Sequence, residues 1–295
     1  QTRLNARMKI NIIFNCNREE IVHRPVLLLS HERSPHTHHS PSSFPFLSFP
    51  FLFHFLSLSL SPSLKIMASM DHFGSAAAEI EVVGITLSSY QQAKATELTA
   101  ACDDIPAGAV TFRVANALAT PFEDGNFDLV WSLESGEHMP DKHEWLAEIS
   151  RLLRPGGTFL CATWCCREHA YSEFAELAEG PAASPLSQEE TVLLGRICKN
   201  YSLPKFVPLS TYDAACHDNN LADFAESARS WTTHVLPFWP AVIRSSLLPL
   251  SLLRIICSLP CGGWTTLKGA ITAKLMMDGF EKGTLNFGVF AVRKL

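Results

Sequence analysis

The feature that most constrains the fold is a strand, helix and strand pattern between residues 110 and 163. A continuous apolar run, Phe127 to Leu133, is followed by a short polar loop, an amphipathic helix and a second apolar run at 158–162. A strand that is apolar on both alternating faces is typical of a parallel sheet with helices on both sides. The pattern therefore predicts an α/β fold with a right-handed crossover between two parallel strands.

The helix between these two strands has clear end signals. Asp141 follows a proline and has Glu144 three residues later, which is the pattern of a capping box. Apolar residues then recur at three- and four-residue spacing and form one stripe: Trp145, Ile149, Leu152 and Leu153. We expect the helix to end at Pro155-Gly156-Gly157, before the second strand begins.

The same alternation of strands and helices continues on both sides of this unit. The patterns before it predict strands at 82–87 and 110–114 and a helix at 89–101. The patterns after it predict helices at 188–201, 241–256 and 266–280, a strand at 224–232 and a last strand at 285–295.

Composition excludes some classes of partner. The formal net charge is -5, and no cluster of lysine or arginine is present to contact phosphates, which argues against nucleic acid. The nine cysteines contain no CxxC pair and show no metal-ligand spacing. We therefore expect reduced thiols and no metal site.

Residues 1–66 differ from the rest of the chain. From Ser40 to Leu64 all residues except His54 are Phe, Leu, Ser or Pro, the four that pyrimidine-only codons encode. We interpret this region as a disordered, translated leader without function, with Met67 as the start. The alternatives are a targeting segment and a membrane anchor. An anchor is disfavoured because Phe44 to Leu60 is shorter than the roughly 20 apolar residues of a spanning helix.

A second apolar segment, SSLLPLSLLRIICSL at 245–259, is interrupted by Arg254 and would be kinked at Pro249. We expect a helix that covers an apolar substrate pocket rather than an integral membrane span.

Three stretches together resemble a known family: GITLSSYQ at 84–91, PFEDGNFDLVWSLESGEHMPDK at 121–142 and RLLRPGGTFLCATWC at 151–165. They are similar to class I S-adenosylmethionine-dependent methyltransferases. More narrowly, they resemble the plant gamma-tocopherol methyltransferase family, which includes alkaloid N-methyltransferases. FWPAVIRS at 238–245 and GWTTLKGA at 263–270 match the same family, so the resemblance covers about residues 80–295.

The resemblance implies a Rossmann-like methyltransferase sheet with helical segments over the substrate. It places a partial core at 80–165, and substrate-cap helices with the last strands at 166–295. The glycine-rich loop that follows the family's first strand is missing, and 67–79 would be a short remnant joined directly to the second strand. We therefore expect the sheet to be incomplete at its first strand.

The resemblance also assigns a cofactor, S-adenosyl-L-methionine, to the ends of the predicted strands. Asn116 stands where the family usually has an aspartate, so it offers an uncharged acceptor to the adenine amino group. The expected cofactor-binding residues are Thr86, Leu87 and Gln91 for the ribose and methionine side, Asn116 and Ala117 for adenine, and Ser132 and Leu133 for methionine.

The candidate catalytic residues are Glu134 and His138, which follow the central strand on the loop facing the substrate. A base there would remove the proton of a phenol such as a chromanol, whereas an indole amine would need little help. For His138 the alternative is a capping role before the helix at Asp141.

Two alternatives to an active C-methyltransferase remain open from the sequence. One is a non-catalytic truncated remnant of such an enzyme, and the other is an alkaloid N-methyltransferase. The resemblance implies a small lipophilic acceptor and a plastid location, or a cytoplasmic one if the protein has no transit peptide.

Overall fold

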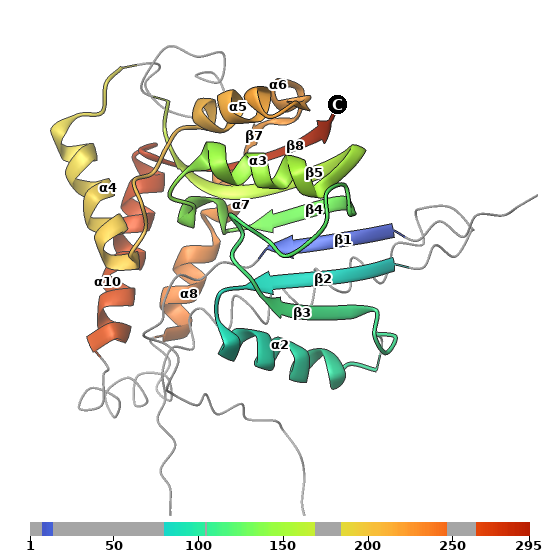
Figure 1. The fold of residues 1–295 in the computed structure, drawn as a ribbon. Coiled ribbons are helices and arrows are strands. Elements are labelled where there is room, and N and C mark those ends of the chain that lie inside the picture. The colour runs from blue at the N-terminus through green and yellow to red at the C-terminus, as the bar shows by residue number, and fades with distance from the viewer. Residues whose placement is uncertain (1–7, 14–79, 104, 169–183, 247–263) are drawn as a thin grey trace, which may run out of the picture.

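The computed structural model describes residues 8–13, 80–103, 105–168, 184–246 and 264–295, and these fold around one eight-stranded sheet (Figure 1). The strands are β1 (Met8–Ile13), β2 (Ile80–Thr86), β3 (Val110–Val114), β4 (Phe127–Leu133), β5 (Leu153–Cys166), β6 (Leu221–Ala222), β7 (Arg229–Ser230) and β8 (Leu285–Lys294). The helices are α2 (Ser89–Ala100), α3 (Lys142–Leu152), α4 (Gln188–Tyr201), α5 (Leu209–Asp218), α6 (Phe224–Ser227), α7 (Thr232–Val235), α8 (Phe238–Ser246) and α10 (Trp264–Glu281), with a 3-10 turn η2 (Gly136–His138).

The strand order is β3-β2-β1-β4-β5-β8-β6, with β7 also pairing with β8. The first five strands are parallel, and β8 runs antiparallel to β5. This is the Rossmann-like α/β sheet that the sequence predicts. The chain order runs from β1 outward to β3 on one side and from β4 to β5 on the other. The direction therefore reverses between β1 and β4, which is the kind of switch point where open α/β sheets bind ligands.

The centre of the sheet requires a correction to the sequence-based prediction. β1 lies between β2 and β4, with Ile10 opposite both Val82 and Leu129, so the central strand is present (Figure 1). The expectation of a sheet incomplete at its first strand is therefore wrong, and so is the expectation of disorder for these six residues. Residues 14–66 and the predicted remnant at 67–79 lie outside the described residues.

Asn11 is a poor fit in this central strand. Its side chain is fully buried, and neither amide atom has a hydrogen-bond partner within the described part of the chain. An unpaired buried amide costs about 1–3 kcal/mol in proteins. The position would suit an apolar β-branched residue better.

We therefore expect Asn11→Val to raise the free energy of unfolding by about 1–2 kcal/mol, because it removes the unpaired amide and favours the strand. Urea denaturation measures the change. The matched control is Asn126→Val, which removes the amide oxygen that accepts from Lys9 Nζ at 3.0 Å and should give no gain. A loss of stability in Asn11→Val would show that the amide does have a partner in the folded protein.

β5 separates two apolar cores because its alternate side chains point to opposite faces. Cys161 and Cys165 belong to the core formed with α3 and α5, whereas Ala162 and Cys166 belong to the core formed with α4, α8 and α10. The loop after β4 contacts β5 between these two cores, so its side chains can lie on either face of the sheet.

The junction between α3 and β5 explains the Pro-Gly-Gly sequence. Asp141 caps α3 by accepting from the backbone N–H groups of His143 and Glu144, as predicted. The helix ends at Leu152, and β5 begins at once, so Pro155 to Gly157 lie within the strand and not before it. Gly157 sits at a shift in the β4–β5 register, where an added Cβ would lie 2.9 Å from the carbonyl oxygen of Arg154.

Several elements after β5 differ from the prediction. The helix at 188–201 is confirmed, and the last strand is β8. The predicted strand at 224–232 is wrong, since the segment divides into α6, the two-residue β7 and the start of α7. α8 begins at Phe238, and residues 247–263 lie outside the described ranges. α5 and β6 were not predicted.

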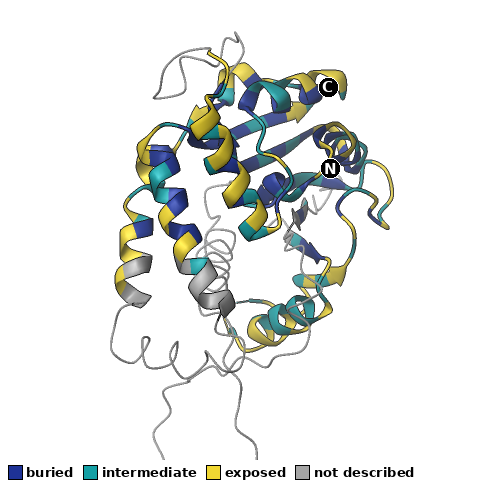
Figure 2. Ribbon diagram, turned by 90° about the vertical axis from the view of Figure 1, so that its left-hand side faces the viewer, coloured by how far each residue is buried: buried dark blue, intermediate teal, exposed yellow. Residues whose placement is uncertain are grey.

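The carboxyl ends of the parallel strands point toward α4, α8 and α10 (Figure 1). These helices cover the end of the sheet where the candidate residues lie. α2, in contrast, has no buried residue and is teal and yellow throughout (Figure 2). No helix in the described ranges is long and apolar enough to cross a bilayer.

Candidate functional site

The predicted site residues lie at the carboxyl ends of β2, β3 and β4. Because β1 separates β2 from β4, these ends form one continuous edge on both sides of the switch point. The sequence prediction that they share one edge of the sheet agrees with the strand order. Their individual contacts differ in ways that the sequence did not indicate.

The end of β2 is tied to the start of α2. The hydroxyl group of buried Thr86 donates to the side-chain oxygen of Gln91 at 2.6 Å and accepts from the backbone N–H of Ser88 at 3.2 Å. Ser88 in turn caps α2 by accepting from the backbone N–H of Gln91. This network fixes the turn and leaves Leu87 40% exposed at the edge.

Asn116 follows β3 in a tight turn. Its side-chain oxygen accepts from the backbone N–H of Leu118 at 3.1 Å, and Ala117 beside it is buried. An amide oxygen has two lone pairs, so it can accept one further hydrogen bond. Val114, the last residue of β3, is 52% exposed and lies on the strand next to β2 and Leu87, which gives an apolar surface beside a polar group.

Hydrogen bonds tie the end of β4 to the following loop and to β5. Ser132 is fully buried, and its hydroxyl group shares a 2.6 Å hydrogen bond with that of Ser135. Leu133 pairs with Ala162 on β5, and the backbone N–H of Glu134 donates to the carbonyl oxygen of Ala162 at 2.8 Å. Pairing with β5 therefore extends one residue past the strand and sets the position of Glu134.

Glu134 has a strained backbone, with φ of 50° in the left-handed region. A residue other than glycine in this region costs of order 1 kcal/mol, and such strain is concentrated at functional sites. Desolvation and the charge of the neighbouring Glu137 raise the pKa of Glu134 well above its ordinary value, and the nearby Trp164 indole opposes that rise.

Glu137 points to the opposite face from Glu134. It is buried, and its carboxylate accepts from the hydroxyl group of Thr163 at 2.8 Å. Burial raises the pKa of Glu137 to about 7, and its hydrogen bonds and the charge of Lys142 oppose the rise. The buried Lys142 ammonium donates to the carbonyl oxygens of Gly136 and Met139 at 2.8 and 2.5 Å. These contacts hold the loop at 134–141 in place, so Glu137 has a structural role.

His138 is neutral at physiological pH, because burial and the nearby charge of Lys142 lower its pKa to about 4. Its Nδ1 atom is buried without a hydrogen-bond partner among the described residues. The capping role that was the alternative for this residue belongs to Asp141. A neutral imidazole with a spare ring nitrogen is suited to hydrogen bonding with a bound molecule and is a weak base.

An aromatic cluster of Trp164, Tyr201 and Trp239 stands beside Glu134. The ring centroids of Trp164 lie 6.1 Å from Tyr201 and 6.0 Å from Trp239. The three residues come from β5, the end of α4 and α8, and they line the second apolar core. The sequence prediction missed this cluster. The sequence signal for the cluster was that Trp164 and Trp239 lie within stretches that resemble the family.

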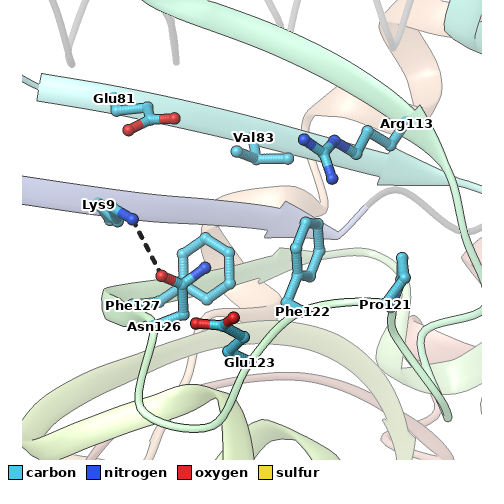
Figure 3. A pocket seen from close by; sticks show the side chains of 9 residues that line it. All are labelled: Lys9, Glu81, Val83, Arg113, Pro121, Phe122, Glu123, Asn126 and Phe127. Carbon is cyan, nitrogen blue, oxygen red and sulfur yellow. Dashed lines mark hydrogen bonds between the residues drawn. The ribbon is translucent and has the colours of Figure 1, made fainter.

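A separate pocket of about 240 Å³, which none of the three aromatic residues lines, lies on a face of the sheet (Figure 3). Val83 and Phe127 contribute apolar surface, and Arg113 stacks on Phe122 at 5.4 Å from the ring centroid. Lys9 and Glu81 line its other end. Its charges are of both signs and none of the predicted site residues lines it, so we do not assign the acceptor site here. No group of metal-binding side chains is present in the described ranges.

Comparison with known proteins places these features in a family. Residues 67–161 match the methyltransferase domain model. The chain is 40% identical over 214 residues to the chloroplastic tocopherol O-methyltransferase of Arabidopsis thaliana. The match covers 72% of this chain and 56% of that protein. It is 27% identical over 215 residues to norajmaline N-methyltransferase of Rauvolfia serpentina, and this match covers 73% of this chain and 68% of that protein. The chain thus spans just over half the length of its tocopherol relative.

The fold has a solved counterpart. Geranyl diphosphate C-methyltransferase from Streptomyces coelicolor A3(2), in complex with Mg2+, geranyl diphosphate and S-adenosyl-L-homocysteine, superposes with a TM-score of 0.51. The match covers 73% of this chain and 63% of that chain at 23% identity, so it speaks to the fold alone.

Proposed function

We propose that this member of the class I S-adenosylmethionine-dependent methyltransferases transfers a methyl group to a small lipophilic acceptor. The chain is of the tocopherol methyltransferase type. The observation that supports this most is the placement of Glu134. A strained, partly buried carboxyl group faces an apolar aromatic cluster at the edge of the sheet where the cofactor site is expected.

The residues at the strand ends fit S-adenosyl-L-methionine. The exposed apolar surfaces of Leu87 and Val114 beside the Asn116 amide suit a flat purine with a polar edge. The other proposed cofactor contacts are made by Thr86, Gln91, Ala117, Ser132 and Leu133. When bound, the cofactor supplies a methyl group activated on a sulfonium. The residues that follow β1 lie outside the described ranges and take no part in this assignment.

The protein's own part is to align the acceptor and to take its proton. Methyl transfer is an in-line displacement, so holding the nucleophile in place accounts for much of the rate. Glu134 is the stronger candidate for proton acceptor because a raised pKa makes its carboxylate a stronger base. His138, with a pKa lowered to about 4, is better suited to hydrogen-bond the acceptor through Nδ1.

The acceptor class is argued from the aromatic cluster and the Glu134 carboxyl group beside it. A hydroxylated aromatic ring such as a chromanol fits both, since the rings pack and the carboxylate accepts the phenol proton. The alternative acceptor is an indole amine, in keeping with the more distant N-methyltransferase relative. By relationship to chloroplastic enzymes we also propose a plastid location.

The experiment is to incubate the full chain with S-adenosyl-L-methionine and either a chromanol or an indole amine, and to detect the methylated product by mass spectrometry. We expect methylation of the chromanol. Methylation of the amine alone would support the N-methyltransferase alternative. Cofactor binding by calorimetry without turnover on either acceptor would contradict the proposed activity and favour a non-catalytic remnant.

A further inference from the structure

We propose that Glu148 of α3 is a positioning residue for the adenine of the cofactor: it holds the turn that carries Asn116 and thereby fixes the direction of the Asn116 amide. This inference rests on the cofactor contacts of the proposed function, in which Asn116 accepts a hydrogen bond from the adenine amino group. It adds a residue from a helix that packs on one face of the sheet, outside the row of strand ends.

The turn after β3 is closed by its own hydrogen bonds. The side-chain oxygen of exposed Asn116 accepts from the backbone N–H of Leu118 at 3.1 Å, and its backbone oxygen accepts from that of Ala119, also at 3.1 Å. The first of these bonds decides the orientation of the amide, because a turned amide would place its NH2 group against the Leu118 N–H. Asn116 therefore presents an oxygen, the acceptor that an adenine amino group needs, as long as the turn keeps its shape.

The residue after this turn is held by α3. Thr120 is buried, and both its backbone N–H and its hydroxyl group donate to Oε1 of Glu148, at 2.7 and 2.6 Å. Glu148 is buried as well, so these bonds are shielded from water. On the other side of Asn116, the backbone N–H of Ala115 donates to the carbonyl oxygen of Thr86 on β2 at 3.0 Å. Asn116 is thus held between β2 and α3, and Glu148 supplies the second attachment.

Arg151, one turn further along α3, fixes the direction of the Glu148 carboxylate. It donates to both carboxylate oxygens, from Nε and Nη2, at 2.8 Å each, and from Nη1 to the carbonyl oxygen of Phe122, also at 2.8 Å. Burial alone would raise the pKa of Glu148, but the hydrogen bonds from Arg151 and Thr120 lower it, so the carboxylate is ionised at neutral pH. Hydrogen bonds to an ionised acceptor are about twice as strong as those between neutral groups. The attachment of Thr120 to α3 is therefore a strong one.

This attachment matters more for an amide at position 116 than it would for a carboxylate. A neutral acceptor gives a weaker hydrogen bond, and any hydrogen bond weakens steeply when its angle falls below about 120°. A carboxylate accepts through either oxygen, whereas an amide turned by half a rotation presents a donor instead. Because Asn116 is an amide, recognition of the adenine amino group depends on the shape of the turn, and that shape depends on Glu148.

The test compares the binding of two compounds to the full chain by calorimetry: S-adenosyl-L-homocysteine and its analogue in which hypoxanthine replaces adenine. Hypoxanthine has an oxygen in place of the amino group, so it cannot donate to Asn116 there. We expect the wild type to bind the adenosyl compound about 10-fold more tightly, and Glu148→Met to reduce this preference to about 2-fold. Methionine keeps the unbranched shape and the helix preference of glutamate but has no carboxylate oxygen. The matched control is Glu144→Met, at an exposed position of the same helix, which should keep the full preference.

Two further variants keep the test decisive if Glu148→Met folds poorly. Thr120→Val removes only the hydroxyl group, with its 2.6 Å bond to Glu148, and should lower the preference less but in the same direction. Asn116→Ala removes the amide itself and should abolish the preference. Adding Glu148→Met to Asn116→Ala should then change the preference no further, because Glu148 acts through that amide.

A full preference in Glu148→Met would overturn the inference. So would an equal loss of affinity for both compounds with the preference intact, since that is the result of a structural role alone. A wild type that binds neither compound, or binds both equally, would overturn it too. The experiment contains no methyl acceptor, so it is independent of turnover. A chain with the expected binding preference that methylates neither acceptor would contradict the proposed function and leave the role of Glu148 in place.

Discussion

Glu134→Gln is expected to lower the rate of methyl transfer to a hydroxylated acceptor by about 10²- to 10⁴-fold, the usual contribution of a positioned base. The amide keeps the size and the hydrogen-bonding reach of the side chain but cannot take a proton. Cofactor binding should change little, because the proposed cofactor contacts lie on other residues. Steady-state assays with the chromanol, together with calorimetry for the cofactor, measure both quantities.

One control variant and one further site variant accompany this prediction. Glu123→Gln changes an exposed glutamate that lines the pocket on the sheet face and should leave the rate unchanged. His138→Ala removes the neutral imidazole and should raise KM more than it lowers kcat, since the proposed role is to hold the acceptor. If Glu134→Gln and His138→Ala both keep full activity on chromanol and amine, the assignment of the site is wrong.

Arg167→Met is expected to lower the free energy of unfolding by about 1.5–3 kcal/mol, because it removes a buried guanidinium and its charge-assisted hydrogen bonds to the partly buried Glu190 carboxylate. The Arg167 side chain is 3% exposed and donates to both carboxylate oxygens of Glu190, at 2.6 and 2.8 Å. It also donates to the carbonyl oxygens of Glu168, Ser184 and Pro185, at 2.9, 2.8 and 3.2 Å. These contacts attach the start of α4 to the end of β5.

The pH dependence of this ion pair has a defined sign. Arg167 lowers the pKa of Glu190 to about 2, from an ordinary value of 4.5. A depressed folded-state pKa contributes stability that is fully present above the unfolded value, so the contribution is lost as the pH falls from about 4.5 towards 2. Arg167→Met should lack this part of the acid dependence.

Urea denaturation of the wild type and the variant at pH 7 and pH 3 measures both effects. The control is Arg154→Met, which breaks the exposed contact with Asp128 and should cost no more than about 1 kcal/mol. The double variant Arg167→Met with Glu190→Gln should recover part of the loss, because no charge is then left unpaired. Equal losses in Arg167→Met and Arg154→Met would contradict the proposed contribution of the Arg167–Glu190 ion pair to stability.

The sequence by itself determined the elements with strong local signals. The capping residue Asp141, the apolar stripe of α3 and the continuous apolar run of β4 depend on neighbours within a few residues, so their patterns were sufficient. The same local patterns placed the predicted site residues at strand ends, and they predicted a right-handed crossover between the two strands that flank α3. The family-type sequence stretches added the class of cofactor.

The tertiary structure decided what depends on distant contacts. Met8–Ile13 has no local feature that marks it as the central strand, and its place follows from pairing with β2 and β4, whose register partners are 72 and 119 residues away. In the same way, Glu134 and Glu137 cannot be told apart by sequence. In the folded chain Trp164, on one face of β5, is near Glu134, whereas Thr163, on the other face, donates to Glu137. A side chain's partner across a sheet is set by register and packing, which a local pattern does not contain, and that is why the base and its structural neighbour are distinguished only in the folded chain.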